Sequence, residues 1–302
     1  MRGRFAPSPT GQLHLGNLRT ALVAWLIARS GDGGFLVRIE DLDRVTSSPT
    51  HETDQLGALR SIGLNWDGAI RRQSERFALY EAAIERLRQG GHVYECFCTR
   101  REIRLAAKAP HGPEPEGRYA GTCRALTDRE RRALSDSGRK AALRLTTDGR
   151  EESFDDRLCG PQTGRVDDIV LRRNDGVPAY NLAVVVDDSA QGVTEVVRGD
   201  DLVASTPSQI FLHRLLDLPI PHYAHVPLVL APDGSRLAKR HGAVTLADLA
   251  ERGASPGDVC SRLAASIGID TGGQAVLAAE LVDRFDPDRI PRMPWRLTAD
   301  EL

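Results

Sequence analysis

A short strand, a turn of proline and glycine, a long helix and a second strand follow one another near the start of the chain. Residues 4–6 and 34–39 form the two β-prone runs, and residues 14–30 between them carry apolar side chains at helical spacing. This alternation predicts an α/β fold with a parallel sheet and helices on its faces. The helix is expected to be amphipathic, with an apolar stripe of Leu15, Leu18, Leu22, Trp25 and Leu26.

The remaining pattern predicts a sheet that is interrupted once. Turn residues and scattered charge replace the alternation after Cys96, which indicates an insertion at about 96–165. We therefore expect a nucleotide-binding domain over residues 1–244, split by that insertion, and a small helical segment over 245–302. Further helices are expected at 51–62, 74–89 and 208–216, and further strands at 168–172, 182–186, 194–198 and 225–230.

Composition and local pattern exclude several classes of protein. The net charge of −2 and the hydrophobic fraction of 41% are ordinary for a globular protein. The longest apolar run, residues 21–28, is too short to cross a bilayer, and no secretory leader precedes it. Five cysteines, an odd number, favour a reducing compartment, so we expect a cytoplasmic protein. Neither a P-loop nor a dinucleotide-binding glycine fingerprint is present.

Two separated segments have the character of one phosphate-binding site. The first, residues 4–17, leads into a helix whose N-terminal backbone N–H groups attract phosphate, with Gly16 leaving room for a flat ligand. The second, residues 234–242, is a short basic loop that carries Lys239. Lysine is rare in this chain, at three of 40 basic residues, which favours a specific use for the compact ammonium of Lys239.

These two segments resemble the marker motifs of class I aminoacyl-tRNA synthetases, and residues 38–43 (Arg-Ile-Glu-Asp-Leu-Asp) are similar to the glutamyl branch. The resemblance covers residues 4 to about 249 and implies a Rossmann-like catalytic domain. Two positions depart from the family pattern: Asn17 replaces its second histidine, and Ala238 replaces a serine.

The resemblance also implies roles for individual residues. His14 and Lys239 would contact the phosphates of ATP, bound with Mg²⁺, as the catalytic residues, and Gly16 and Asn17 would complete the ATP site. The glutamate site would include Glu40 for the ammonium group and arginine for the carboxylate. Its residues would be Arg4, Phe5, Ala6, Pro7, Ser8, Glu40, Tyr180 and Arg198. Taken singly, His14 could instead be a histidine bonded at a helix start, Glu40 a solvated charge and Arg198 half of a surface ion pair.

A cysteine cluster lies in the expected insertion. Cys96, Cys98 and Cys123 have spacings that suit zinc, which prefers thiolates and four ligands, although three free thiols would give the same pattern. From coordination chemistry the fourth ligand is open, with His111 and Cys159 better candidates than a tyrosine. The order Cys-x-Cys, Tyr, Cys resembles the subfamily of glutamyl-Q tRNA(Asp) synthetases, and this resemblance implies Tyr119 as the fourth ligand and one structural Zn²⁺.

The subfamily resemblance implies an unusual acceptor, namely the queuosine base in the anticodon of tRNA(Asp). About 60 residues follow the lysine loop, too few for the large anticodon-binding region of glutamyl-tRNA synthetases. Residues 99–150 hold 13 Lys and Arg against 7 Asp and Glu, which suits either an RNA backbone or a solvated surface. We expect a monomer that does not bind membranes. The alternatives are a shortened glutamyl-tRNA synthetase that charges a 3′ end, a ligase that joins an amino acid to a small amine, and a non-catalytic tRNA-binding module.

Overall fold

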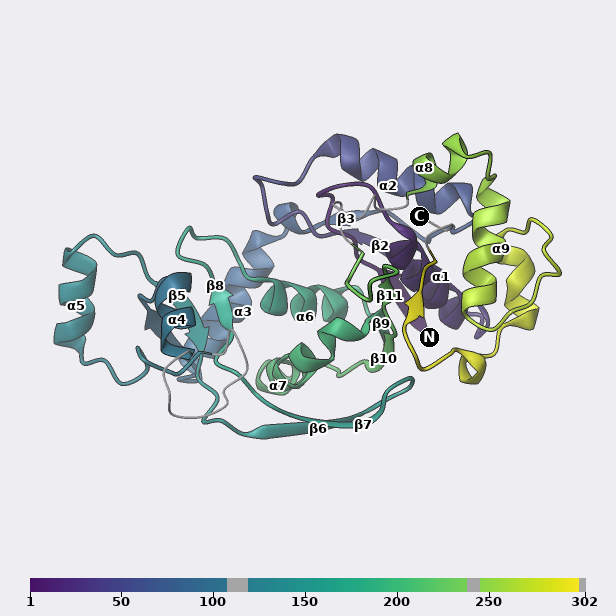
Figure 1. The fold of residues 1–302 in the computed structure, drawn as a ribbon. Coiled ribbons are helices and arrows are strands. Elements are labelled where there is room, and N and C mark those ends of the chain that lie inside the picture. The colour runs from purple at the N-terminus through teal and green to yellow at the C-terminus, as the bar shows by residue number, and fades with distance from the viewer. Residues whose placement is uncertain (108–118, 238–244, 299–302) are drawn as a thin grey trace.

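The computed structural model describes residues 1–107, 119–237 and 245–298. Helices and strands alternate through the first half, as expected for an α/β fold, and helical turns dominate the end of the chain (Figure 1). The strands are β1 (Arg2–Phe5), β2 (Gly34–Ile39), β3 (Arg71–Arg72), β4 (Val93–Cys96), β5 (Ala142–Leu145), β6 (Glu151–Asp156), β7 (Gly160–Arg165), β8 (Val170–Arg172), β9 (Glu195–Gly199), β10 (His222–Val226), β11 (Val229–Leu230) and β12 (Trp295–Arg296). The α-helices are α1 (Leu15–Arg29), α2 (Pro49–Ser61), α3 (Phe77–Gln89), α4 (Arg100–Ala107), α5 (Asp128–Asp136), α6 (Tyr180–Ala190), α7 (Thr206–Leu215), α8 (Leu246–Glu251) and α9 (Pro256–Ser266).

The main sheet has the strand order β3-β2-β1-β9-β10-β6-β7. Its pairs are parallel, except for the antiparallel β6–β7 hairpin at one edge. The chain builds outward from β1 through β2 and β3, and then returns to the other side of β1 with β9 and β10. In open parallel sheets, ligands bind at the carboxyl ends of the strands where the order reverses in this way. The order therefore locates a binding crevice between β1 and β9.

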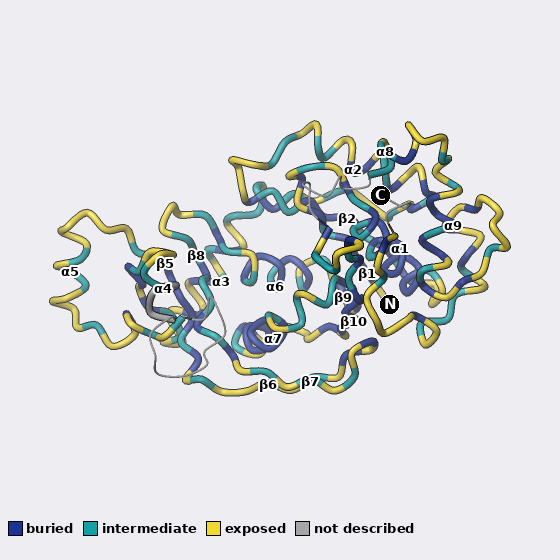
Figure 2. The backbone as a smooth tube through the Cα atoms, in the orientation of Figure 1, coloured by how far each residue is buried: buried dark blue, intermediate teal, exposed yellow. Residues whose placement is uncertain are grey.

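Helix α1 is more deeply buried than its expected apolar stripe indicates. The five stripe residues are buried, and so are Arg19, Val23 and Ile27 on other faces. The expectation of an amphipathic helix was therefore wrong. The physical reason is that α1 lies between the main sheet and the C-terminal α9, which covers the side that would otherwise face solvent (Figures 1 and 2).

The expected strand at 182–186 is also wrong, because these residues lie in helix α6. A short apolar run can be buried as a strand or as a helix, and periodicity alone does not separate the two. The helix buries most of the apolar run together with Asp187 and Asp188, whose carboxylates pair with arginines from β1, β2 and the start of α3.

The segment predicted as an insertion, 96–165, is divided between two sheets. Strands β4, β5 and β8 form a separate antiparallel sheet, which with α4 and α5 lies at one end of the molecule (Figure 1). Strands β6 and β7 instead extend the main sheet through the pairing of Tyr223 with Asp156. The separate sheet thus begins at β4 and ends at β8, and part of the predicted insertion belongs to the main sheet.

The C-terminal residues fold against the main domain. Helix α9 packs on α1, and β12 pairs with β11, so the tail adds a two-stranded parallel ribbon beside the crevice. Cys260 on α9 is fully buried, whereas Cys159 is exposed. Among the described residues, no helix has both the length and the apolar content to cross a bilayer.

Candidate functional site

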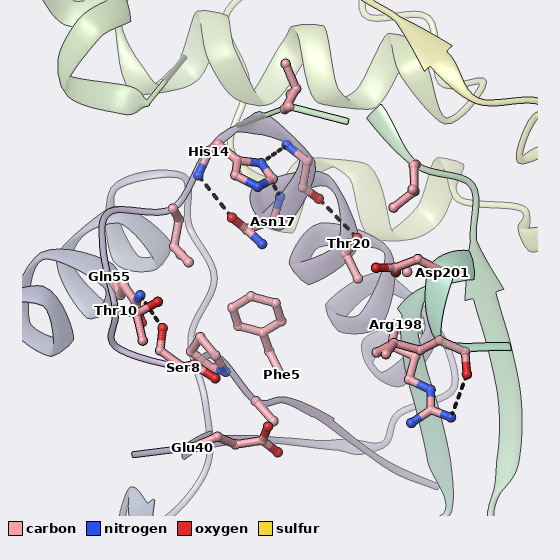
Figure 3. A pocket seen from close by; sticks show the side chains of 18 of the residues that line it. Phe5, Ser8, Thr10, His14, Asn17, Thr20, Glu40, Gln55, Arg198 and Asp201 are labelled. Atoms are coloured by element: carbon pink, nitrogen blue, oxygen red, sulfur yellow. Dashed lines mark hydrogen bonds between the residues drawn. The ribbon is translucent and has the colours of Figure 1, made fainter. Parts of the chain in front are cut away.

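A cavity of about 580 Å³ opens where the carboxyl ends of β1 and β9 diverge. It collects residues from both predicted ligand sites (Figure 3). His14 and Asn17 lie at one end, and Glu40 and Arg198 lie at the other, beyond Phe5. The predicted residues that line it are Arg4, Phe5, Ala6, Pro7, Ser8, His14, Gly16, Asn17, Glu40, Tyr180 and Arg198. One crevice can therefore hold two adjacent ligands, and the individual roles of these residues stay predictions.

His14 caps helix α1 with its own ring. Its Nδ1 accepts from the backbone N–H groups of Gly16 (3.0 Å) and Asn17 (3.3 Å), and the Asn17 side chain accepts from the His14 backbone N–H. These N–H groups are thus hydrogen-bonded within the protein, and not free for phosphate as the sequence suggested. Burial lowers the pKa of His14, so its ring is neutral and its proton lies on Nε2. His14 can therefore donate a hydrogen bond to a phosphate oxygen.

Gly16 makes room for the side chain of His14. A Cβ placed there would lie 2.9 Å from Cε1 of His14 and 3.0 Å from its Nδ1. The absence of a side chain lets the His14 ring fold back onto the helix start. Gly16 thus positions the capping histidine, and its contact with a flat ligand stays a prediction.

Lys239 lies outside the described residues, but both flanks of its loop meet the first segment. Arg236 and Leu237, near the start of the segment 234–242, line the cavity, and Thr245, just after its end, pairs with His14. This pairing joins the two halves of the predicted ATP site, which are more than 200 residues apart in sequence.

Arg4 and Glu40 belong to a buried ion-pair network under the cavity. Asp188 accepts from Arg4 Nε (3.1 Å) and from Arg38 Nη1 (2.6 Å), and Arg38 also pairs with Glu40 at 3.1 Å. Burial raises the pKa of Asp188, but the charges of Arg38 and Arg4 outweigh it and hold this pKa at about 2. Glu40 is not the solvated charge considered above, since its side chain is only 9% exposed.

Arg198 is buried and bonded to neutral groups. Its Nε donates to His225 Nε2 (3.1 Å), Nη1 donates to Gln209 (2.8 Å), and Nη2 donates to the Thr206 hydroxyl (2.8 Å). Within the described ranges, no carboxylate pairs with it, which rules out a surface ion pair among those residues. The site therefore presents a desolvated cation whose chemical complement is a ligand carboxylate.

The three cysteines of the predicted metal site come together. The sulfur atoms of Cys96, Cys98 and Cys123 all lie within 4.8 Å of one another, which suits a thiophilic cation. The Tyr119 hydroxyl oxygen lies 3.9 Å from Cys98 Sγ and accepts from the Cys123 backbone N–H at 2.7 Å. Of the other two candidates, Cys159 instead contacts the His225 carbonyl in the main sheet, and His111 lies outside the described residues.

The basic segment 99–150 is partly paired within the protein. Arg139 bonds Glu102, and Arg124 bonds Asp168, while helix α5 buries none of its residues. An exposed, arginine-bearing helix remains in this segment, and its use as an RNA surface stays a prediction.

Sequence reasoning missed the residues behind the cavity. Asp188 contacts Arg4, His225 contacts Arg198 and Asp156 contacts His225, all from helices or strands remote in the chain. Buried polar groups of this kind carry no spacing pattern, so no signal in one sequence identifies them. Asp201, which lines the cavity, was within reach because it follows Arg198 in the same short block.

Comparisons with known proteins agree with this geometry. The family described as tRNA synthetases class I (E and Q), catalytic domain, matches residues 1–299. A glutamyl-Q tRNA(Asp) synthetase of Nocardia farcinica is 58% identical, covering 99% of this chain and 94% of that protein. One from Symbiobacterium thermophilum is 48% identical, covering 99% and 97%. A glutamate–tRNA ligase of Nitratidesulfovibrio vulgaris is 40% identical, covering 99% of this chain but 64% of that protein.

Solved structures show the same fold. A glutamate tRNA ligase from Elizabethkingia meningosepticum, in complex with its amino acid, superposes with a TM-score of 0.84 at 28% identity. The match covers 100% of this chain and 68% of that one.

Proposed function

This chain belongs to the family of class I tRNA synthetases (E and Q) and is a ligase, and we propose that it attaches glutamate to the queuosine base in the anticodon of tRNA(Asp). In the first step, the α-carboxylate of glutamate attacks the α-phosphate of ATP, and pyrophosphate leaves. In the second, a hydroxyl of the queuosine ring attacks the glutamyl-adenylate, and AMP leaves. No protein nucleophile is needed, so the protein acts by positioning and by charge stabilisation.

The observation that carries this proposal is the charge state around Arg198. Arg4 and Arg38 each have a carboxylate partner in the protein, whereas the described partners of Arg198 are neutral. A buried cation without a counter-ion favours a ligand that brings a carboxylate, such as the side chain of glutamate. Glu40 lies on the opposite side of the cavity floor, where it can receive the substrate ammonium group (Figure 3).

The ATP end of the cavity supplies donors for phosphate. Nε2 of His14 carries a proton, and Lys239 follows the cavity-lining Leu237 by two residues. A hydrogen-bond donor and an ammonium stabilise the charge that builds on the phosphates as pyrophosphate departs. Magnesium would enter the site bound to ATP, as part of the substrate.

The queuosine acceptor is supported by the relatives. The proteins that match at 58% and 48% identity, over nearly their whole length, are named glutamyl-Q tRNA(Asp) synthetase, and the glutamate–tRNA ligase matches at 40%.

We further propose one structural zinc held by Cys96, Cys98, Cys123 and Tyr119, because three sulfurs and a phenol oxygen cluster there. The monomeric state and the cytoplasmic location stay predictions.

A labelling experiment tests the acceptor. The protein is incubated with ATP, labelled glutamate and tRNA(Asp) that either carries or lacks queuosine. Label should attach only to the modified tRNA, and it should survive nuclease removal of the terminal adenosine. Periodate serves as a control, because it destroys both the terminal ribose diol and the queuosine diol, and so should abolish labelling.

Other outcomes identify the other candidate functions. Loss of label after 3′ trimming would indicate a shortened synthetase that charges a 3′ end. An acid-soluble labelled product would indicate a ligase for a small amine. Failure of glutamate-dependent pyrophosphate exchange would indicate a non-catalytic tRNA-binding module.

A further inference from the structure

A buried chain of three polar side chains lies behind the cavity. Asp156 ends β6, His225 lies in β10 and Arg198 lies in β9, and each is at most 5% exposed. His225 Nδ1 and Asp156 Oδ2 are 2.5 Å apart, and His225 Nε2 accepts from Arg198 Nε at 3.1 Å. The sheet register creates this alignment, because His225 pairs with Arg198 across the β9–β10 ladder while β6 pairs with β10 on the other side.

The surroundings of Asp156 fix its charge. Its Oδ1 accepts backbone N–H groups from Leu158 (2.9 Å), Cys159 (2.8 Å) and His225 (3.1 Å). Burial raises the pKa of Asp156, but the His225 ring and these N–H groups outweigh burial and hold the pKa below its usual value. Asp156 is thus an ionised carboxylate, which can only accept hydrogen bonds.

The acceptor-only carboxylate fixes the tautomer of His225. Nδ1 must carry the ring proton, and Nε2 keeps the lone pair that receives the Arg198 Nε–H. Burial lowers the pKa of His225, so that the ring is neutral near pH 7. The charged or titratable groups around the ring are Asp156 from β6, Arg198 from β9, Asp200 from the turn after β9, and Tyr223, which stacks on the ring from its own strand.

The hydrogen bonds of the Arg198 guanidinium are of two lengths, and a ligand could replace the longer ones. One short bond holds each nitrogen, from Nε to His225 and from the terminal nitrogens to Gln209 and Thr206. Each terminal nitrogen makes one further contact of 3.4 Å, to the Tyr180 hydroxyl and to the Leu202 carbonyl. A carboxylate can replace these two long contacts while the three short bonds hold the guanidinium plane.

We propose that Asp156 and His225 are positioning residues for the substrate carboxylate. Asp156 fixes the His225 tautomer, and His225 fixes the plane of the Arg198 guanidinium through its Nε–H. The inference rests on the proposed function in one respect, namely that Arg198 receives the side-chain carboxylate of glutamate. It adds two residues that act through Arg198 and have no contact of their own with glutamate.

The variant Asp156→Asn tests the tautomer with almost no change in shape. The three backbone N–H groups keep the amide oxygen at the Oδ1 position, so the amide nitrogen donates to Nδ1 and moves the ring proton to Nε2. The Nε2–H then faces the Arg198 Nε–H, which loses its acceptor, while the Thr206 hydroxyl, 3.2 Å from Nε2, can accept the displaced ring proton. A buried donor left unpaired should raise the KM for glutamate about 10- to 100-fold. The KM for ATP, and kcat at saturating glutamate, should change by no more than about threefold, because the phosphate end of the cavity is untouched.

Two comparisons separate positioning from general damage to the fold. Asp155→Asn, on the same strand but exposed, is the matched control and should leave the KM for glutamate unchanged. His225→Gln can present an amide oxygen near the Nε2 position, so it should retain a lower KM for glutamate than His225→Leu, which offers no acceptor.

Nitrogen-15 NMR of the histidine rings reads the tautomer without any assay of activity. Wild-type His225 should show a protonated Nδ1 and a bare Nε2, and Asp156→Asn should show the reverse. A wild-type ring protonated on Nε2 would overturn the inference, and so would equal losses of glutamate and ATP affinity in Asp156→Asn.

Different results would contradict the proposed function and the positioning role. Absent glutamate-dependent exchange in the wild type contradicts the proposed function, whereas full exchange with an unchanged glutamate KM in Asp156→Asn contradicts the positioning role alone.

Discussion

The backbone of His14 pairs with the backbone of Thr245 in an antiparallel bridge. His14 caps the helix at one end of the cavity, and Thr245 follows the segment of the sequence that carries Lys239. The bridge ties the end of that segment to the histidine cap, while Leu237 holds its start at the cavity wall. Two short segments that are far apart in the sequence thus meet beside one cavity.

Lys239→Ala should lower glutamate-dependent pyrophosphate exchange about 100-fold or more, because a charged contact to the departing phosphates is lost. Lys140→Ala, which removes an exposed lysine from the basic segment, is the control and should leave exchange unchanged. Near-normal exchange by the Lys239 variant would remove this lysine from the catalytic site.

Gly16→Ala should displace the His14 ring, because the new Cβ would lie 2.9 Å from Cε1. The KM for ATP should rise about 10-fold or more, as expected when a capping and phosphate-binding group is moved. Gly57→Ala is the matched control: it lies in helix α2 with nothing within 4 Å of the added Cβ, and should leave the kinetics alone. Unchanged ATP kinetics in the Gly16 variant would contradict this positioning of His14.

Arg198→Ala should raise the KM for glutamate about 100-fold or more, because the substrate carboxylate would be buried without its partner. Arg198→Lys should recover only part of this loss, since an ammonium lacks the planar set of donors that His225, Gln209 and Thr206 hold. Steady-state kinetics in both substrates measure the effect, and Arg214→Ala, on an exposed part of α7, serves as control. A glutamate KM equal to that of the wild type would exclude Arg198 from the substrate site.

The purified protein should hold about one zinc per chain, and Cys98→Ser should lower that content. Burial raises the pKa of the metal-free Cys98 thiol to about 12, so a bound cation is needed to keep a thiolate there near pH 7. Elemental analysis of protein never exposed to chelator is the measurement. Cys159→Ser, which changes an exposed cysteine outside the cluster, should retain the metal. Absence of zinc from the wild type would refute the proposed site.

Acid should destabilise the fold through His213, a buried histidine on α7. Burial lowers its pKa to about 4, from 6.5 in the unfolded chain. The unfolded state therefore binds a proton that the folded state rejects, and stability is lost as the pH falls from about 6.5 towards 4. The loss at pH 5 should be about 2 kcal/mol.

His213→Gln should remove this part of the pH dependence, because the amide does not titrate. Denaturant unfolding at pH 7.5 and pH 5 measures the difference for each protein. His222→Gln, which changes an exposed histidine on β10, is the control. An equal loss of stability in wild type and His213→Gln would show that another group is responsible.

The amino-acid sequence by itself determined the first unit of the fold and many of the residues that line the cavity. The β1–α1–β2 unit could be predicted because its apolar residues follow one another in a single continuous stretch of the sequence, and the helical part of that stretch is long. The cavity-lining residues could be named because two short motifs and the block around Arg198 resemble a known family, and the structure brings the described ones to one cavity. The cysteine spacing likewise anticipated the cluster of three sulfurs.

Only the tertiary structure decided which faces are covered and which charges meet. Helix α1 is buried on nearly all sides because α9 returns from the far end of the chain to cover it, and residues 182–186 form part of a helix although their apolar run also suits a strand. His225 and Asp156 reach Arg198 only because β6, β10 and β9 are neighbours in the sheet. The energy of a buried hydrogen bond depends on groups that are distant in sequence, and so it leaves no periodic trace in the chain.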